Sequence, residues 1–188
     1  MKQVGQIRPH MERALFVVGR QNAGKSTLLR HMFIDPRLGT GGKIPTASKI
    51  RPVALSHERC LVVRCTSPHE RNEPLDAFFK KLDRAMEIAY REYWRFNFAC
   101  AMQLTTAGKM PDFVTLCEEF QERFEPERIR VIQIDPCQNG KPGVRLARTE
   151  IDQLRYHRIE MVVVDGHRSP TSNQDPNGYL LADFFDFA

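Results

Sequence analysis

The sequence lacks the long apolar runs that membrane proteins need. No apolar stretch approaches the roughly 18 residues of a membrane-spanning helix, and the N-terminus lacks the apolar core of a signal peptide. The five cysteines are scattered, odd in number and free of any C-x-x-C pair, so they predict neither a metal site nor a disulfide framework. Several lie in apolar runs, where cysteine behaves as a small buried hydrophobe. We expect reduced thiols, a cytoplasmic location and no membrane partner.

Internal repeats, low-complexity segments and domain-scale linkers are also missing from the sequence. A chain of 188 residues suits one domain with a full-sized core. Residues 1–13 are polar, contain Pro9 and show no periodicity, which predicts a short N-terminal arm. Residues 14–188 form the expected domain.

Strand-like and helical patterns alternate along this domain. Short apolar runs predict strands at residues 14–18, 53–55, 61–65, 96–102, 129–134 and 161–164, of which 53–55 and 61–65 form a hairpin. Helices are expected at residues 26–33, 75–94, 111–124 and 147–157. Apolar strands that alternate with helices are typical of the α/β class, a mostly parallel sheet covered by helices on both faces. Ligands of such folds bind beyond the carboxyl ends of the strands.

A phosphate-binding pattern stands at one such end. The form G-x-x-x-x-G-K-[ST] follows the first strand directly and opens a helix. Its residues are Gly19, Arg20, Gln21, Asn22, Ala23, Gly24, Lys25 and Ser26, followed by Thr27. The glycines let successive backbone N–H groups point at one phosphate. Lys25 reaches the β- and γ-phosphates, which makes it the expected catalytic group, and the Ser26 hydroxyl completes a Mg²⁺ shell. The pattern predicts nucleotide binding with Mg²⁺ as cofactor.

The stretch from Gly19 to Leu29 resembles the first motif of translation-factor-related GTPases, within the superfamily of P-loop NTPases. Asn22 carries part of the likeness, because Asn tolerates left-handed backbone angles at this turn position. The resemblance implies a three-layer P-loop NTPase fold that binds ATP or GTP. The later GTPase motifs depart from the family pattern. Residues 105–108 read T-T-A-G where D-x-x-G is expected, and N-K-x-D is missing, so the choice of base stays open.

Two strands run directly into an acidic residue, as the second Mg²⁺-binding motif of P-loop enzymes requires. Asp135 follows the strand 129–134, and Asp165 follows the strand 161–164. Either carboxylate can hold a water of the Mg²⁺ shell, and either can instead cap the next turn. Thr40 is a further metal candidate, with Thr46 as the alternative, because both lie in the Gly-rich segment 37–50, where GTPases place a Thr on Mg²⁺.

The net charge of +5 is unevenly spread along the chain. Residues 1–70 hold 12 Lys or Arg and 4 Asp or Glu, whereas the remaining residues hold 16 and 19. A basic half beside a phosphate loop suits a polyanion, either the nucleotide alone or nucleic acid as well. The apolar C-terminal tail, from Tyr179 to Phe187, is expected to pack either on the domain's own sheet or against a protein partner.

Together these features predict a Mg²⁺-dependent nucleoside triphosphatase that hydrolyses ATP or GTP slowly, as a molecular switch or an accessory NTPase. A kinase for a small molecule or nucleoside is the first alternative, with the basic residues of 37–51 and 123–130 clamping the acceptor. The second alternative is a non-catalytic scaffold that binds nucleotide and recruits protein or nucleic acid. Phosphate transfer to an acceptor would favour the kinase, and salt-sensitive DNA binding would favour the scaffold.

Overall fold

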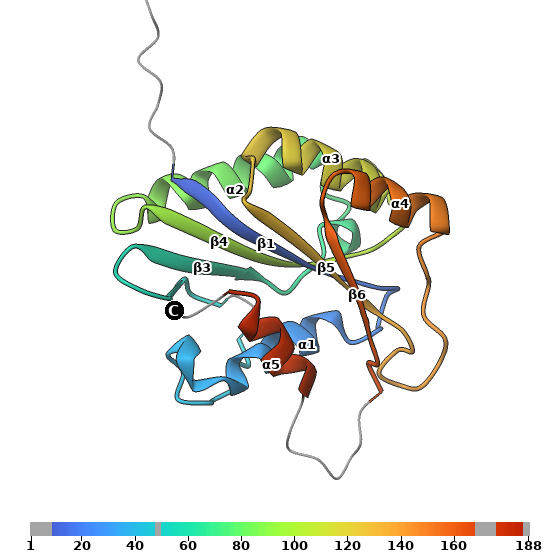
Figure 1. The fold of residues 1–188 in the computed structure, drawn as a ribbon, viewed down its shortest axis with the longest axis horizontal. Coiled ribbons are helices and arrows are strands. Elements are labelled where there is room, and N and C mark those ends of the chain that lie inside the picture. Colours follow the sequence, from blue (N-terminus) through green and yellow to red (C-terminus); the bar gives the residue numbers. More distant parts are fainter. Residues whose placement is uncertain (1–8, 48–49, 168–175, 186–188) are drawn as a thin grey trace, which may run out of the picture.

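The computed structural model describes residues 9–47, 50–167 and 176–185 (Figure 1). Six strands form one sheet in the order β2-β3-β4-β1-β5-β6. Their bounds are β1 His10–Val18, β2 Val53–Ala54, β3 Arg59–Arg64, β4 Arg95–Met102, β5 Arg128–Ile134 and β6 Glu160–Val164. All neighbouring strands are parallel except β2, which forms the expected antiparallel hairpin with β3. The mostly parallel α/β sheet predicted from the sequence is confirmed.

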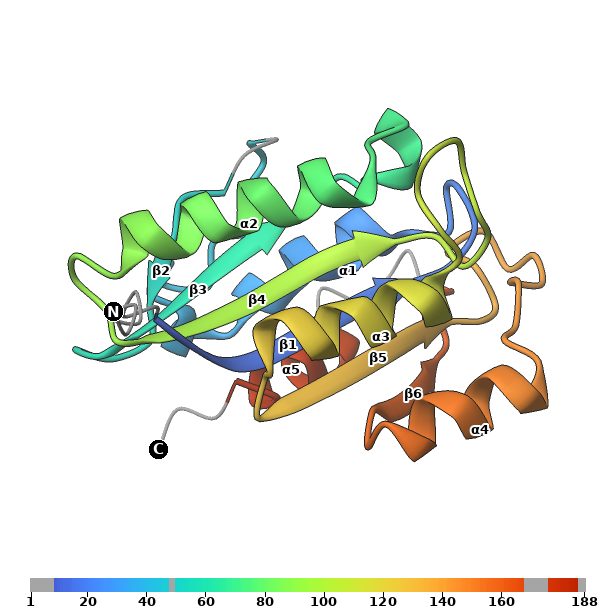
Figure 2. The same ribbon diagram turned by 90° about the horizontal axis from the view of Figure 1, so that it is seen from above.

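Helices cover both faces of this sheet, so the described residues form three layers. Figures 1 and 2 show α2, α3 and α4 on one face and α1 and α5 on the other. The α-helices are α1 Lys25–His31, α2 Leu75–Ala89, α3 Phe113–Phe124, α4 Arg148–Tyr156 and α5 Pro176–Asp183. Shorter 3-10 helices are η1 Met32–Ile34, η2 Pro36–Leu38 and η3 His69–Arg71.

The central strand β1 is buried on both of its faces. Ala14, Phe16 and Val18 belong to the core beneath α2 and α3, whereas Leu15 and Val17 belong to the core beneath α1 and α5. This alternation follows from the two-residue period of a strand. Because β1 packs into both cores, its carboxyl end, where the phosphate loop begins, is fixed in position.

The N-terminal arm is shorter than expected. β1 starts at His10, so the last four residues of the segment 1–13 belong to the sheet. Met11 is buried there, and Glu12 accepts a hydrogen bond of 2.7 Å from Nε of the buried Arg59. Residues 1–8 lie outside the described part of the chain. This polar segment can join the sheet because the buried Glu12 carboxylate pairs with Arg59.

Two helix boundaries also differ from the expected ones. The second helix, α2, ends at Ala89 rather than near residue 94. The third, α3, begins at Phe113, because Asp112 acts as its N-cap rather than as part of its first turn. The Asp112 carboxylate accepts hydrogen bonds of 3.0 Å from the backbone N–H groups of Val114 and Thr115.

The apolar tail packs on the chain's own sheet over most of its described length. Leu181, Ala182, Phe184 and Phe185 are buried in the core on the α1 side. The Arg13 guanidinium donates to the Phe184 carbonyl and lies 5.9 Å from the centre of its ring. Exposed apolar surface remains at the side chain of Tyr179, and Phe187 lies outside the described residues.

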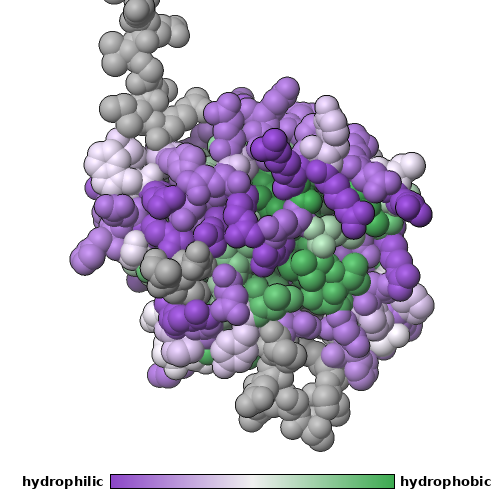
Figure 3. Space-filling model, in the orientation of Figure 1, coloured by the Kyte–Doolittle hydropathy of each residue, from purple (hydrophilic) through white to green (hydrophobic). Residues whose placement is uncertain are grey.

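Part of the positive charge of the basic N-terminal half is paired with carboxylates. Arg37 pairs with Asp35 at 2.5 Å and also with Asp183, and Arg64 pairs with Glu73. Figure 3 shows a hydrophobic patch over the edge strand β6. Val163 of this strand is 54% exposed. No helix within residues 9–47, 50–167 and 176–185 has the length and apolar character needed to cross a membrane.

Candidate phosphate-binding site

The loop from Gly19 to Gly24 connects the carboxyl end of β1 to the first turn of α1. Asn22 has φ of +62° and Gly24 has φ of +105°, so the chain turns sharply before the helix, as the sequence predicts for Asn22. Gly24 is the N-cap of α1 and has no side chain to satisfy the helix's first N–H groups. These groups therefore remain available to an anion.

The segment after β5 supports the back of this loop. The backbone N–H of Gln138 donates to the Ala23 carbonyl at 3.1 Å, and its side-chain Nε2 donates to the Asn22 carbonyl at 3.2 Å. A Cβ at Gly24 would lie 3.2 Å from the Gln138 Cβ, which is closer than a side chain there tolerates without movement. The contact holds the loop against the segment that follows β5.

Lys25 lies inside the loop. Its Nζ donates to the carbonyls of Gly19 at 3.1 Å and Arg20 at 2.8 Å, and its side chain is only 3% exposed. Burial lowers the pKa of the Lys25 ammonium, and the Glu70 carboxylate, 3.5 Å from Nζ, opposes that shift by favouring the charged form. A buried cation in this position is suited to an anionic ligand, because a phosphate would replace the weaker carbonyl acceptors.

Ser26 has the hydrogen-bonding pattern that a metal-binding hydroxyl needs. Its Oγ donates to the carbonyl of Cys65, just beyond the end of β3, at 2.6 Å. Because the hydroxyl hydrogen is directed at Cys65, the oxygen lone pairs are left for another partner. Mg²⁺ prefers such hard oxygen ligands. The Glu70 carboxylate, 3.5 Å from the Nζ of the neighbouring Lys25, is a second oxygen donor beside the loop.

Sequence analysis did not identify Glu70, which lies on η3 after β3. The neighbouring side chains fix this turn. His69 is buried, and its Nε2 lies 3.1 Å from the Pro111 carbonyl, which can only accept, so Nε2 carries the proton. Burial lowers the pKa of the His69 imidazole and keeps it neutral. Glu73, at the other end of the turn, binds Arg64 and also Lys81 at 2.6 Å.

The two predicted acidic candidates are engaged elsewhere. The Asp135 carboxylate accepts a hydrogen bond of 2.7 Å from the Gly143 N–H and pairs with Arg145, and the first of these interactions contributes most to lowering the Asp135 pKa. Asp165 is exposed and accepts from the His167 N–H at 2.7 Å. It lines a small cavity of about 30 Å³ behind Gly24. Both carboxylates therefore cap turns beyond β5 and β6.

The third candidate, Thr40, is not brought to Ser26 in this structure. Its hydroxyl donates to the Phe33 carbonyl at 3.0 Å. Phe33 lies seven residues beyond Ser26, which corresponds to about 10 Å along a helix axis. A role on Mg²⁺ would require the segment 37–50 to rearrange.

The turn at residues 105–108, which resembles D-x-x-G, follows β4, the strand beside β1. A side chain at Gly108 would collide with the amide of Asn72, the residue that ends η3. The turn therefore lies against the segment that carries Glu70. Its Thr105 supplies a hydroxyl where the family pattern has a carboxylate.

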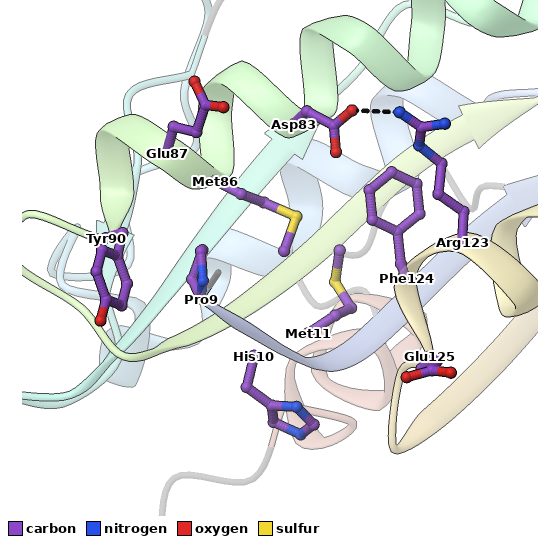
Figure 4. A pocket seen from close by; sticks show the side chains of 10 residues that line it. All are labelled: Pro9, His10, Met11, Asp83, Met86, Glu87, Tyr90, Arg123, Phe124 and Glu125. Atoms are coloured by element: carbon purple, nitrogen blue, oxygen red, sulfur yellow. Dashed lines mark hydrogen bonds and ion pairs between the residues drawn. The ribbon is translucent and has the colours of Figure 1, made fainter. Parts of the chain in front are cut away.

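A separate cavity of about 510 Å³ lies at the opposite end of β1, between α2 and α3 (Figure 4). Met11, Met86 and Phe124 line it, and an ion pair between Asp83 and Arg123, at 2.5 Å, lies at its edge. β1 begins at this cavity and ends at the phosphate loop, so the two are roughly 25 Å apart at the rise of a strand. The cavity is distinct from the candidate site.

Clustered metal ligands are not found in the described parts of the chain: no three His, Cys, Asp or Glu side chains are placed to hold an ion together. All five cysteines are buried and unpaired by disulfides. No family model, curated protein or solved structure matches this chain.

Proposed function

We propose that this protein binds a nucleoside triphosphate with Mg²⁺ and hydrolyses its β–γ phosphate bond slowly. The observation that carries the proposal is the placement of Lys25 and Ser26. The Lys25 ammonium is buried within the loop, and the Ser26 hydroxyl directs its hydrogen away from the site. Both arrangements suit the polyphosphate of a nucleotide.

Each residue has a specific task in this scheme. The N–H groups from Asn22 to Thr27 would bind the β-phosphate, and Lys25 would leave the Gly19 and Arg20 carbonyls to neutralise charge between the β- and γ-phosphates. Ser26 would hold the metal, and Mg²⁺, when bound, supplies positive charge to the phosphate oxygens. Water attacks the γ-phosphorus, the bond to the bridging oxygen breaks, and nucleoside diphosphate and inorganic phosphate are released.

Thermal unfolding in the presence of nucleotides tests the binding step. A ligand at 100 times its Kd stabilises the folded state by about 2.7 kcal/mol. For a chain of this size the corresponding rise in Tm is roughly 5–11 °C. We expect ATP or GTP with Mg²⁺ to produce this rise in the wild type, and ADP or GDP to show whether the γ-phosphate contributes.

Lys25→Ala should abolish the stabilisation, because the cation facing the phosphates is lost. Lys80→Ala, in which an exposed lysine of α2 is removed, is the matched control and should behave as the wild type. Release of inorganic phosphate should follow the same order. A wild type that none of the four nucleotides stabilises would refute the proposal. Transfer of phosphate to an added alcohol rather than to water would replace hydrolysis by the kinase reaction.

A further inference from the structure

The phosphate loop has an acidic neighbour that the predicted motifs do not include. We propose that Glu70 makes nucleotide binding depend on Mg²⁺, by binding the cation together with Ser26. This inference rests on the proposed function, because it concerns the same loop.

Glu70 is the more solvent-exposed partner in its ion pair with Lys25. Its Oε1 is 3.5 Å from the Lys25 Nζ, and its side chain is 29% exposed, whereas that of Lys25 is 3% exposed. A phosphate that reaches Lys25 from solvent therefore arrives beside the Glu70 carboxylate. In the free protein, Glu70 serves as the counter-ion that a phosphate would otherwise supply.

The charges explain why a divalent cation is needed. Lys25 carries one positive charge, which cannot neutralise both the Glu70 carboxylate and a terminal phosphate. Glu70 consequently repels a nucleotide that arrives without metal. A bound Mg²⁺ would supply the missing positive charge, and Glu70 would then help to hold the ion instead of repelling the nucleotide.

Glu70 cannot readily avoid this encounter, because its backbone is anchored. The N–H groups of Arg71 and Glu73 donate to the Pro68 carbonyl, both at 3.1 Å, and His69 ties the turn to Pro111. Ser26 is in turn tied to Cys65, at the start of the same connection. The connection that carries Glu70 is thus hydrogen-bonded to Ser26 of α1 at its start and to Pro111 through His69.

Glu70→Gln tests the inference, because it removes the charge and keeps the side chain's size. Glu122→Gln, at an exposed position of α3, is the matched control for net charge. Isothermal titration calorimetry would measure the Kd of ATP and GTP for each protein, in MgCl₂ and in EDTA. We expect the wild type and Glu122→Gln to bind about 10–100-fold more tightly with Mg²⁺.

In Glu70→Gln, this preference for Mg²⁺ should fall to nearly one. Binding should weaken in MgCl₂ and strengthen in EDTA, because the metal ligand and the repelling charge are lost together. Glu70→Asp, which restores the charge on a shorter side chain, should recover part of the preference. The Tm of each variant without nucleotide verifies that the proteins compared are folded.

The two proposals fail in different ways. An unchanged preference for Mg²⁺ in Glu70→Gln overturns the role of Glu70 and leaves the proposed function standing. Equally weakened nucleotide binding in MgCl₂ and in EDTA also overturns that role, because removal of a repelling charge should strengthen binding in EDTA. A wild type that binds neither nucleotide in either buffer overturns both proposals.

Discussion

Substituting Gly24 tests whether the segment after β5 holds the phosphate loop in place. Gly24 has φ of +105°, and a Cβ there would lie 3.2 Å from both Cβ and Oε1 of Gln138. Gly39 also has a positive φ, +74°, but a Cβ at that position meets nothing within 4 Å. Gly39→Ala therefore measures the cost of the backbone conformation, and Gly24→Ala measures the same cost plus the contact with Gln138.

The expected magnitudes follow from these two contributions. A left-handed conformation costs an L-residue about 1–2 kcal/mol, and both variants incur this cost. Gly24→Ala also displaces Gln138, whose hydrogen bonds to the Asn22 and Ala23 carbonyls contribute about 1 kcal/mol each. The free energy of unfolding should thus fall by about 1–2 kcal/mol more in Gly24→Ala than in Gly39→Ala. The corresponding difference in Tm is roughly 2–8 °C.

Urea unfolding of the single variants, and of each combined with Gln138→Ala, separates the contributions. The Gly24 and Gln138 substitutions should be coupled, because the shorter side chain relieves part of the contact. The Gly39 and Gln138 substitutions should be additive, as expected for separate sites. Equal losses in Gly24→Ala and Gly39→Ala, with additive energies in both pairs, would refute the idea that Gln138 supports the loop.

Three further outcomes are expected. Glu12→Ala should lower the free energy of unfolding by about 3–5 kcal/mol in urea, because the buried Arg59 would lose its carboxylate partner and keep only neutral acceptors such as the Phe185 carbonyl; a loss under about 1 kcal/mol would contradict the buried pair. Burial opposes ionisation of the Asp112 N-cap, but hydrogen bonds led by that from the Thr115 N–H outweigh it and lower the Asp112 pKa. The Asp112 N-cap should stabilise the folded protein by about 1 kcal/mol relative to Asp112→Ala. In acid titrations of Tm, this stabilisation should be complete above the ordinary aspartate pKa and should disappear as the pH falls through the lower pKa of Asp112 in the folded state. Burial raises the pKa of the Cys100 thiol to about 12, so a thiol reagent at about pH 8 should label it only after unfolding; fast labelling of the native protein would show that the site opens.

Much of the fold is predictable because its signals are local. The apolar runs that form β4 and β5 are visible in the sequence, and the residues of α2 recur at helical spacing on the buried face. The position of the phosphate loop is equally local, because a strand, a glycine-rich turn and a helix follow one another directly. Even the left-handed conformation of Asn22 follows from the residue type.

The order of the strands is not a local property, and it accounts for the residue that sequence analysis missed. β4 lies between β1 and β3, so α1, which packs against β4, brings Ser26 to the end of β3. Glu70 follows that strand through a short turn, whereas sequence analysis considered acids that directly follow a strand. An acid within a few residues of any strand's carboxyl end is a usable signal, but only the strand order selects among such acids.

The helix α5 was unpredictable for a different reason. Its apolar residues occur on all sides and show no stripe, so the pattern predicted burial without a secondary structure. In the structure α5 packs against α1 and η1, and the ring of Phe184, which follows α5 directly, lies 4.6 Å from the Arg130 guanidinium. Contacts with distant parts of the chain, rather than helical periodicity, decide its conformation.

The distribution of unfavourable backbone conformations supports a ligand at the loop. Four residues other than glycine have positive φ in the described parts of the chain: Asn22 lies in the loop itself, and Asn72 ends the turn that carries Glu70. Lys25, at the end of the loop, is a cation whose burial opposes its own charge. Left-handed backbone and a buried charge both cost free energy on folding. A phosphate that binds the loop and the ammonium would offset them, which is the pattern expected where strain is retained for function.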